Sequence, residues 1–133
     1  MKNSSIKKKI INAPISIGEL VDKITILEIK KNKLQNSKLE NVLKELSYLR
    51  RLMEKNKIEI TDDLFTQLKE INLTLWDVED QIRIKEKNKE FDNTFIELAR
   101  SVYFKNDKRA EIKKSINRLS NSEITEEKFY ADY

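Results

Sequence analysis

Apolar residues recur at alternating steps of four and three along residues 64–83. They are Leu64, Leu68, Ile71, Leu75, Val78 and Ile82. This spacing is the seam of an amphipathic helix and does not fit a strand, whose side chains alternate with a period of two. Beside the seam runs a second, mostly polar row made of Asn72, Trp76, Glu79 and Arg83. We expect the chain to be organised around this helix. Polar groups at the edge of a core are costly unless they are paired, so the second row is the first place to look for a functional site.

Three more segments carry helical signals. Ser16 and Glu19 have the spacing of a capping box, which predicts a helix from there to about residue 35. Its apolar face is expected to be buried, and its opposite face holds Asp22, Lys23, Glu28, Lys30 and Lys31. A second capping box at Ser37 and Glu40 predicts that the next helix starts there and runs to about residue 55.

The ends of the two later helices are marked by capping residues. Thr61 or Asp62 begins the third helix, which reaches about residue 86, and Asp92 or Asn93 begins a fourth that reaches about residue 119. Polar breaks near residues 36, 57 and 88 predict two antiparallel hairpins. The expected fold is an all-α, four-helix up-down bundle in a single domain, 1–133. A basic N-terminal arm covers 1–13, and a C-terminal tail, 120–133, docks on the bundle. One long coiled coil is the alternative.

The amino-acid composition limits the catalytic groups and metal ligands that the protein can have. The chain has 133 residues, 38% of them charged, with one glycine and one proline, which fits a helical bundle better than a sheet. It has no cysteine and no histidine, which excludes thiolate nucleophiles, cysteine zinc sites and the usual general base. A metal would need oxygen ligands. No cofactor is therefore expected, except that Glu79 and Asp80 could hold one Mg²⁺.

Net charge and hydropathy limit the kinds of partner and the cellular location that we expect. The net charge of +4 is modest and comes mostly from lysine, so nucleic acid is not an expected partner. No apolar run reaches the roughly 18 residues of a membrane span, and the basic start is a poor signal peptide. The cytoplasm is the expected location. The sequence also allows a homo-oligomer.

Two clusters are candidates for a binding site. The third helix brings together Asn72, Trp76, Glu79, Asp80 and Arg83, and the fourth brings together Arg100, Tyr103, Asn106, Asp107 and Arg109. Arginines suit anionic groups, carboxylates suit hydroxyls or Mg²⁺, and tryptophan offers a stacking face. The alternative interpretation is structural, with Glu79 and Arg83 pairing along one helix and buried ion pairs fixing the helix register.

An antiparallel hairpin of the third and fourth helices predicts a particular contact. Positions equally far from the turn face one another, so Glu79 or Asp80 should meet Arg100 or Arg109. A structural network would pair every guanidinium, whereas a binding site would leave an arginine facing an open pocket.

Three blocks of the sequence resemble an uncharacterised bacterial family, a domain of unknown function of about this length. They are PISIGELVDKITILEIK, INLTLWDVEDQIR and FIELARSVYFKNDKRAEIKKSIN followed by EEKFY. Members are encoded among genes for surface polysaccharide synthesis, so the resemblance implies a role there. The pattern from Leu75 to Arg83, with Asn106 and Arg109, is similar to a second uncharacterised helical family. The first helix faintly resembles helical chorismate mutases, but it has lysines where that fold needs arginines.

Two functions follow as hypotheses. The first is a polar site between the third and fourth helices that binds an anionic sugar or sugar nucleotide, with or without transforming it, in cell-surface glycan synthesis. The second is a non-catalytic helical interaction module, in which the charged cluster is structural and the partner is a glycan enzyme. The sequence leaves open whether the protein is an enzyme.

Overall fold

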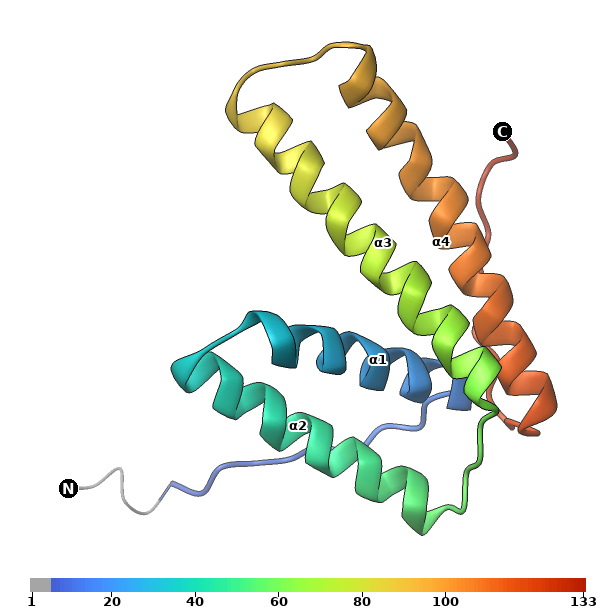
Figure 1. Ribbon diagram of the computed structural model, residues 1–133. Helices are drawn as coiled ribbons and strands as arrows, with labels where there is room; N and C mark the ends of the chain where they lie inside the picture. Colours follow the sequence, from blue (N-terminus) through green and yellow to red (C-terminus); the bar gives the residue numbers. More distant parts are fainter. Residues whose placement is uncertain (1–5) are drawn as a thin grey trace.

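The computed structural model describes residues 6–133, which form four helices (Figure 1). The helices are α1 (Ile17–Lys33), α2 (Asn36–Lys55), α3 (Asp62–Lys87) and α4 (Asn93–Leu119). The described residues contain no strand, so the predicted all-α class is confirmed. Of the predicted basic arm, residues 1–5 lie outside the described part, and residues 6–13 are non-helical and exposed.

The helices form two antiparallel hairpins, α1/α2 and α3/α4, as predicted, and the hairpins cross one another (Figure 1). α1 lies against the lower part of the α3/α4 hairpin, and the upper part of that hairpin extends away from it. α1 contacts all three other helices, whereas α2 contacts α1 alone. The organising element is therefore α1, and the expectation that the chain is organised around α3 is wrong.

Capping side chains start three of the helices where the sequence predicted. The backbone N–H of Glu19 donates to Ser16 Oγ at 3.1 Å. Thr61 and Asp92 cap α3 and α4 in the same way, accepting from backbone N–H groups at 3.3 Å and 2.9 Å. The predicted capping box at Ser37 is wrong, because α2 already begins at Asn36. Asn36 has a φ of 58°, a left-handed conformation that asparagine tolerates better than most residues.

The apolar core has two parts, one on each side of α1. Between α1 and α2 lie Leu20, Ile24, Leu27, Val42 and Leu46. Where α1 crosses α3 and α4 lie Val21, Leu68, Ile71, Ile112 and Ile116. A helix that is covered on both sides must be apolar around most of its circumference. This explains why eight residues of α1, Asp22 and Thr25 among them, are buried.

Gly18 lets the start of α1 approach α4 closely. A Cβ atom on Gly18 would lie 2.6 Å from the backbone oxygen of Lys113 and 2.9 Å from Asn117 Oδ1. The backbone N–H of Gly18 donates to that same Oδ1 at 2.6 Å, and the N–H of Ile17 donates to Ser122 Oγ at 3.1 Å. Free backbone donors at the beginning of α1 are thus satisfied by residues near the other end of the chain.

The C-terminal tail runs back along α4 (Figure 1). Glu126 forms an ion pair with Lys113 at 3.0 Å, and the Tyr133 hydroxyl donates to Asp107. The Tyr133 ring packs on Tyr103 and Phe104, with centroids 5.0 Å and 4.7 Å away. The tail is therefore docked at separate points, and between them Phe129 is 98% exposed.

Candidate functional site

Buried polar side chains gather where α1 crosses α3 and α4. We call this cluster the polar junction and define it as Asp22, Thr25, Asn72, Arg109 and Lys113. Asp22 and Thr25 are completely buried, and Asn72 and Lys113 are each 6% exposed. Charged and polar groups at such depth are stable only when they are paired, so the pairing decides what the cluster can do.

Asp22 and Arg109 are paired through both carboxylate oxygens. Arg109 Nε donates to Asp22 Oδ1 at 3.1 Å, and Nη2 donates to Oδ2. This is the fork-to-fork geometry in which an arginine holds a carboxylate most strongly. Arg109 Nη1 also donates to Asn106 Oδ1 at 3.4 Å. The hydrogen bond to Asp22 raises the pKa of Arg109 above its usual value, so its charge is fixed.

Lys113 lies beside that pair with its ammonium group shared among carboxylates. Its Nζ atom is 2.7 Å from Glu19 Oε1, 3.0 Å from Glu126 Oε1 and 3.8 Å from Asp22 Oδ2. Burial lowers the pKa of Lys113, but the hydrogen bonds that its ammonium group donates to Glu19 and Glu126 outweigh this effect, and the net shift of the pKa is upward. The lysine therefore stays charged and is a poor general base at neutral pH.

Neutral side chains complete the polar junction. Asn72 Nδ2 donates to Asp22 Oδ1 and to Thr25 Oγ1, both at 2.8 Å, and Thr25 Oγ1 donates to the backbone oxygen of Asp22 at 2.7 Å. Within residues 6–133, no buried side-chain nitrogen or oxygen lacks a hydrogen-bond partner. The carboxylates of Asp22, Glu19 and Glu126 surround the two cations, Arg109 and Lys113. The junction is therefore satisfied from within the chain.

Three of the predicted site residues meet in the polar junction or at its edge: Asn72, Asn106 and Arg109. The others do not join them. Glu79 pairs with Arg83 at 3.6 Å, and Arg100 pairs with Glu97 at 3.6 Å, with all four side chains mainly exposed. The predicted contact of Glu79 or Asp80 with Arg100 or Arg109 is wrong. In this part of α3 the buried residue is Val78, and the next position, Glu79, is turned about 100° away from it.

The remaining predicted residues lie apart from one another. Trp76 is half-buried, and Lys33 Nζ sits 5.4 Å from the centre of its ring. Asp80 is exposed. Tyr103 and Asp107 both contact Tyr133 of the tail. The hydrogen bond to Asp107 raises the pKa of the Tyr133 hydroxyl to about 12.

Sequence reasoning missed Asp22, which it placed on the solvated face of the first helix. A signal was present in the row formed by Gly18, Asp22, Thr25 and Ile29, with helical steps of four, three and four. Small residues in such a row favour close helix packing, and an aspartate within it needs a cation. Lys113 continues the row of Asn106 and Arg109 on α4 in the same way.

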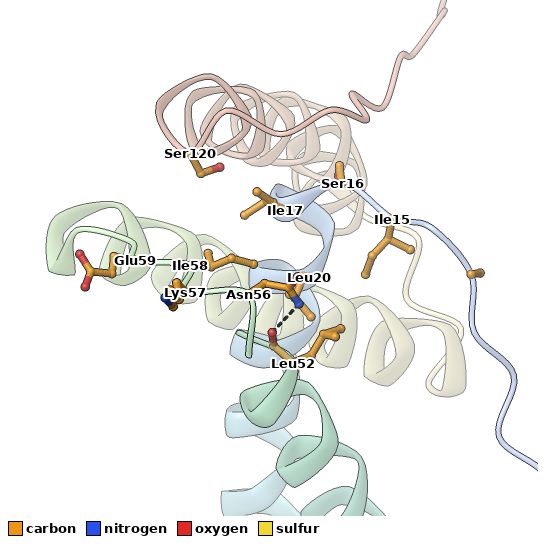
Figure 2. A pocket seen from close by; sticks show the side chains of 11 residues that line it. Ile15, Ser16, Ile17, Leu20, Leu52, Asn56, Lys57, Ile58, Glu59 and Ser120 are labelled. Carbon is orange, nitrogen blue, oxygen red and sulfur yellow. Dashed lines mark hydrogen bonds between the residues drawn. The ribbon is translucent and has the colours of Figure 1, made fainter. Parts of the chain in front are cut away.

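A groove of about 550 Å³ lies away from the polar junction, between the start of α1 and the end of α2 (Figure 2). Its apolar lining includes Ile15, Ile17, Leu20, Leu52 and Ile58. Asn56, one of its polar residues, donates its side-chain amide to the backbone oxygen of Leu52 at 2.9 Å (Figure 2). None of the predicted site residues lines this groove, and Lys57 is its single cationic residue.

Other kinds of site find no support in the described part of the chain. Residues 6–133 contain no group of three or more acidic side chains placed to hold a metal ion. Across the same residues, no helix has both the length and the apolar character that crossing a membrane requires.

A second ionic site ties the two hairpins together through Glu28. Its carboxylate lies 2.7 Å from Arg50 Nη2 on α2 and 3.0 Å from Lys69 Nζ on α3. Burial alone would raise the pKa of Glu28, but the hydrogen bonds from Arg50 and Lys69 lower it below 4.5. Glu28 therefore favours the folded state while it is ionised.

We expect stability to fall when Glu28 is protonated. A folded-state pKa below the ordinary value of 4.5 stabilises the fold above that pH, and the contribution is lost as the pH falls through the folded-state pKa. Urea titrations at a series of pH values should show that Glu28→Gln removes about 1 kcal/mol at pH 7 and less in acid. The matched control is Glu70→Gln, an exposed position on α3. Equal pH profiles for the two variants would contradict this assignment.

Comparison with known proteins places the chain in a family. The model of a family of unknown function, DUF6165, matches residues 11–132, which is nearly the whole chain. A search of curated proteins and a search of solved structures each find no match. The matched range includes all four helices, the polar junction and the tail up to residue 132. The chain therefore belongs to DUF6165, a family of unknown function.

Proposed function

We propose that this protein is a non-catalytic helical interaction module whose charged cluster is structural. The observation that supports this proposal is the complete pairing of Arg109 with Asp22 and Asn106. An anion-binding site would present a guanidinium to an open cavity, with its counter-charge supplied by the ligand. The side chain of Arg109 is 26% exposed, and its guanidinium has its counter-charge inside the protein, on Asp22.

The chemistry of the remaining surface points the same way. The chain has no histidine or cysteine, and the carboxylates of the predicted α3 row are exposed side chains rather than a paired acid and base. Arg83 and Arg100 each pair within their own helix. The groove at the start of α1 is lined by apolar and polar residues in similar number. Its lining has one cation, Lys57, and one anion, Glu59, so it offers no excess of positive charge to a sugar phosphate.

The setting of the proposed module comes from the resemblance to a bacterial family encoded among surface polysaccharide genes. On that basis we propose that its partner is an enzyme of cell-surface glycan synthesis. The binding of an anionic sugar or sugar nucleotide stays as the competing prediction, and one experiment separates the two.

The first test is a thermal-shift screen of nucleotides, sugar nucleotides and Mg²⁺. A ligand that binds only the folded state increases the free energy of unfolding, by about 2.7 kcal/mol at a hundredfold excess over its Kd. The melting temperature rises as a result. We expect no shift for any of these compounds. A sugar nucleotide that shifts wild type but not Arg100→Ala, an exposed position whose loss should leave the fold intact, would overturn the proposal.

The second test concerns the partner. Affinity capture of the full chain from cells that express it should retain a glycan-synthesis enzyme. The two purified proteins should then form a complex of defined stoichiometry in sedimentation velocity. Failure of every retained enzyme to reassociate after purification would contradict the module.

A further inference from the structure

The upper part of the α3/α4 hairpin has no buried side chain. From residue 79 to residue 111, which covers the end of α3 and most of α4, every residue is at least partly exposed. These are regular helices, and helices of this length are normally held by an apolar face packed against the rest of the protein. In this segment each helix packs mainly on the other helix of the hairpin. α4 also contacts the tail, whose Tyr133 ring lies on Tyr103 and Phe104, and α1, where Asp22 pairs with Arg109.

The seam between the two helices is correspondingly incomplete. Ile82 of α3 and Phe95, Leu98 and Val102 of α4 are only half-buried. Two helices cover one side of such a seam, and a four-helix bundle covers both sides. Ile84 at 59% and Ile96 at 49% exposure add further apolar surface to the same part of the hairpin.

A second apolar stripe runs along α4 beside the seam. Ile96, Ala99 and Tyr103 are spaced by three and four residues, which puts them on one face, and all three are exposed. Steps of three and four are the pattern of a helix that packs against another helix, and the small Ala99 at the centre allows close approach. Within the described residues Ile96 and Ala99 are left exposed. Tyr103 contacts the Tyr133 ring of the tail and still keeps 40% of its surface exposed.

The accessible surface is large for the size of the chain. A compact monomer of 15.8 kDa should expose about 7,300 Å². The protein exposes 10,276 Å². The exposed residues 6–13, the tail and the uncovered hairpin all contribute to the excess. Obligate homodimers bury about 1,000–2,500 Å² per subunit, so an interface of that size is smaller than the excess of about 3,000 Å² and fits within it.

The charge of the hairpin end allows two copies to meet. Between Trp76 and Phe104 there are seven acidic and five basic side chains, although the whole chain carries a net charge of +4. Two such ends are nearly neutral and repel each other weakly, whereas the basic remainder of the chain would oppose association.

We infer that the stripe formed by Ile96, Ala99 and Tyr103 is covered by the same stripe of a second copy. The upper parts of two α3/α4 hairpins then form an intermolecular four-helix bundle. In an antiparallel two-fold pairing, Ala99 lies near the symmetry axis and Ile96 packs against Tyr103 of the other copy. This inference stands apart from the proposed function, because it concerns α4 and not the polar junction.

Sedimentation equilibrium of the full chain tests the inference. Wild type should be a dimer in the micromolar range. Ala99→Glu should weaken dimerisation at least about a hundredfold, because it buries two like charges near the axis. Thr94→Glu is the matched control, since it adds the same charge to an exposed position of α4 off the stripe and should stay dimeric. Circular dichroism should show equal helix content in all three proteins.

Disulfide trapping supplies a second measurement, made clean by the absence of native cysteine. Ala99→Cys should form a covalent dimer on mild oxidation, because the two copies of a residue near a two-fold axis lie close together. Thr94→Cys should remain a monomer on a denaturing gel that is run without reductant. A wild-type monomer, an Ala99→Glu dimer as tight as wild type, or equal trapping at both positions would each overturn the inference.

Discussion

Asp22→Ala should lower the free energy of unfolding by about 3–5 kcal/mol, because it leaves Arg109 and Lys113 partly uncompensated inside the protein. Asp22 is completely buried and is the acceptor for Arg109 through both oxygens. Asn72 would lose an acceptor as well. Urea denaturation followed by circular dichroism measures the change.

The double variant Asp22→Leu/Arg109→Met provides the control for that result. Replacing both partners of a buried pair with apolar residues of similar volume is often close to neutral. The double variant should therefore be more stable than Asp22→Ala, although Lys113 keeps only Glu19 and Glu126 as acceptors. A cost below about 1 kcal/mol for Asp22→Ala would show that the polar junction does not hold the hairpins together.

Leu68→Ala should cost about 2–5 kcal/mol, in the upper part of that range because the site cannot collapse easily. Leu68 has no exposed surface and packs among Val21, Ile112 and Ile116, at the point where three helices meet. Truncation leaves a cavity bounded by all three helices.

Leu73→Ala is the matched control, because Leu73 lies on the same helix and is 41% exposed. Its substitution should change stability by no more than about 0.5 kcal/mol. Thermal and urea unfolding should rank the two variants in the same order. Similar costs at both positions would mean that the hairpin crossing is not where the stability of the fold is concentrated.

Local features of the sequence predicted most of the fold. The starts of α1, α3 and α4 follow from Ser16, Thr61 and Asp92, because an N-cap acts on backbone donors two or three residues away. The hairpins follow from the short polar breaks between helices. The start of α2 was misplaced by one residue, because Asn36 enters the helix through a left-handed conformation that no side-chain spacing reveals.

The site was predicted less well, because its contacts depend on how the hairpins cross. The sequence showed that Arg109 needed an acceptor, and the expected acceptor was on the neighbouring helix. The actual acceptor, Asp22, is 87 residues away and is buried only because α1 is covered from two sides. Helical periodicity describes one face at a time, so it could not show that the polar face of α1 would be covered by α3 and α4.

The start of α1 is capped by residues that are synthesised near the end of the chain. The N–H groups of Ile17 and Gly18 bind acceptors 105 and 99 residues later in the sequence. On the ribosome, α1 and α2 are therefore synthesised long before Asn117 and Ser122 exist, and Asp22 stays hydrated until Arg109 emerges. Contacts of such long range slow folding. The contacts that cap α1 therefore cannot form before the last helix and the start of the tail have been made.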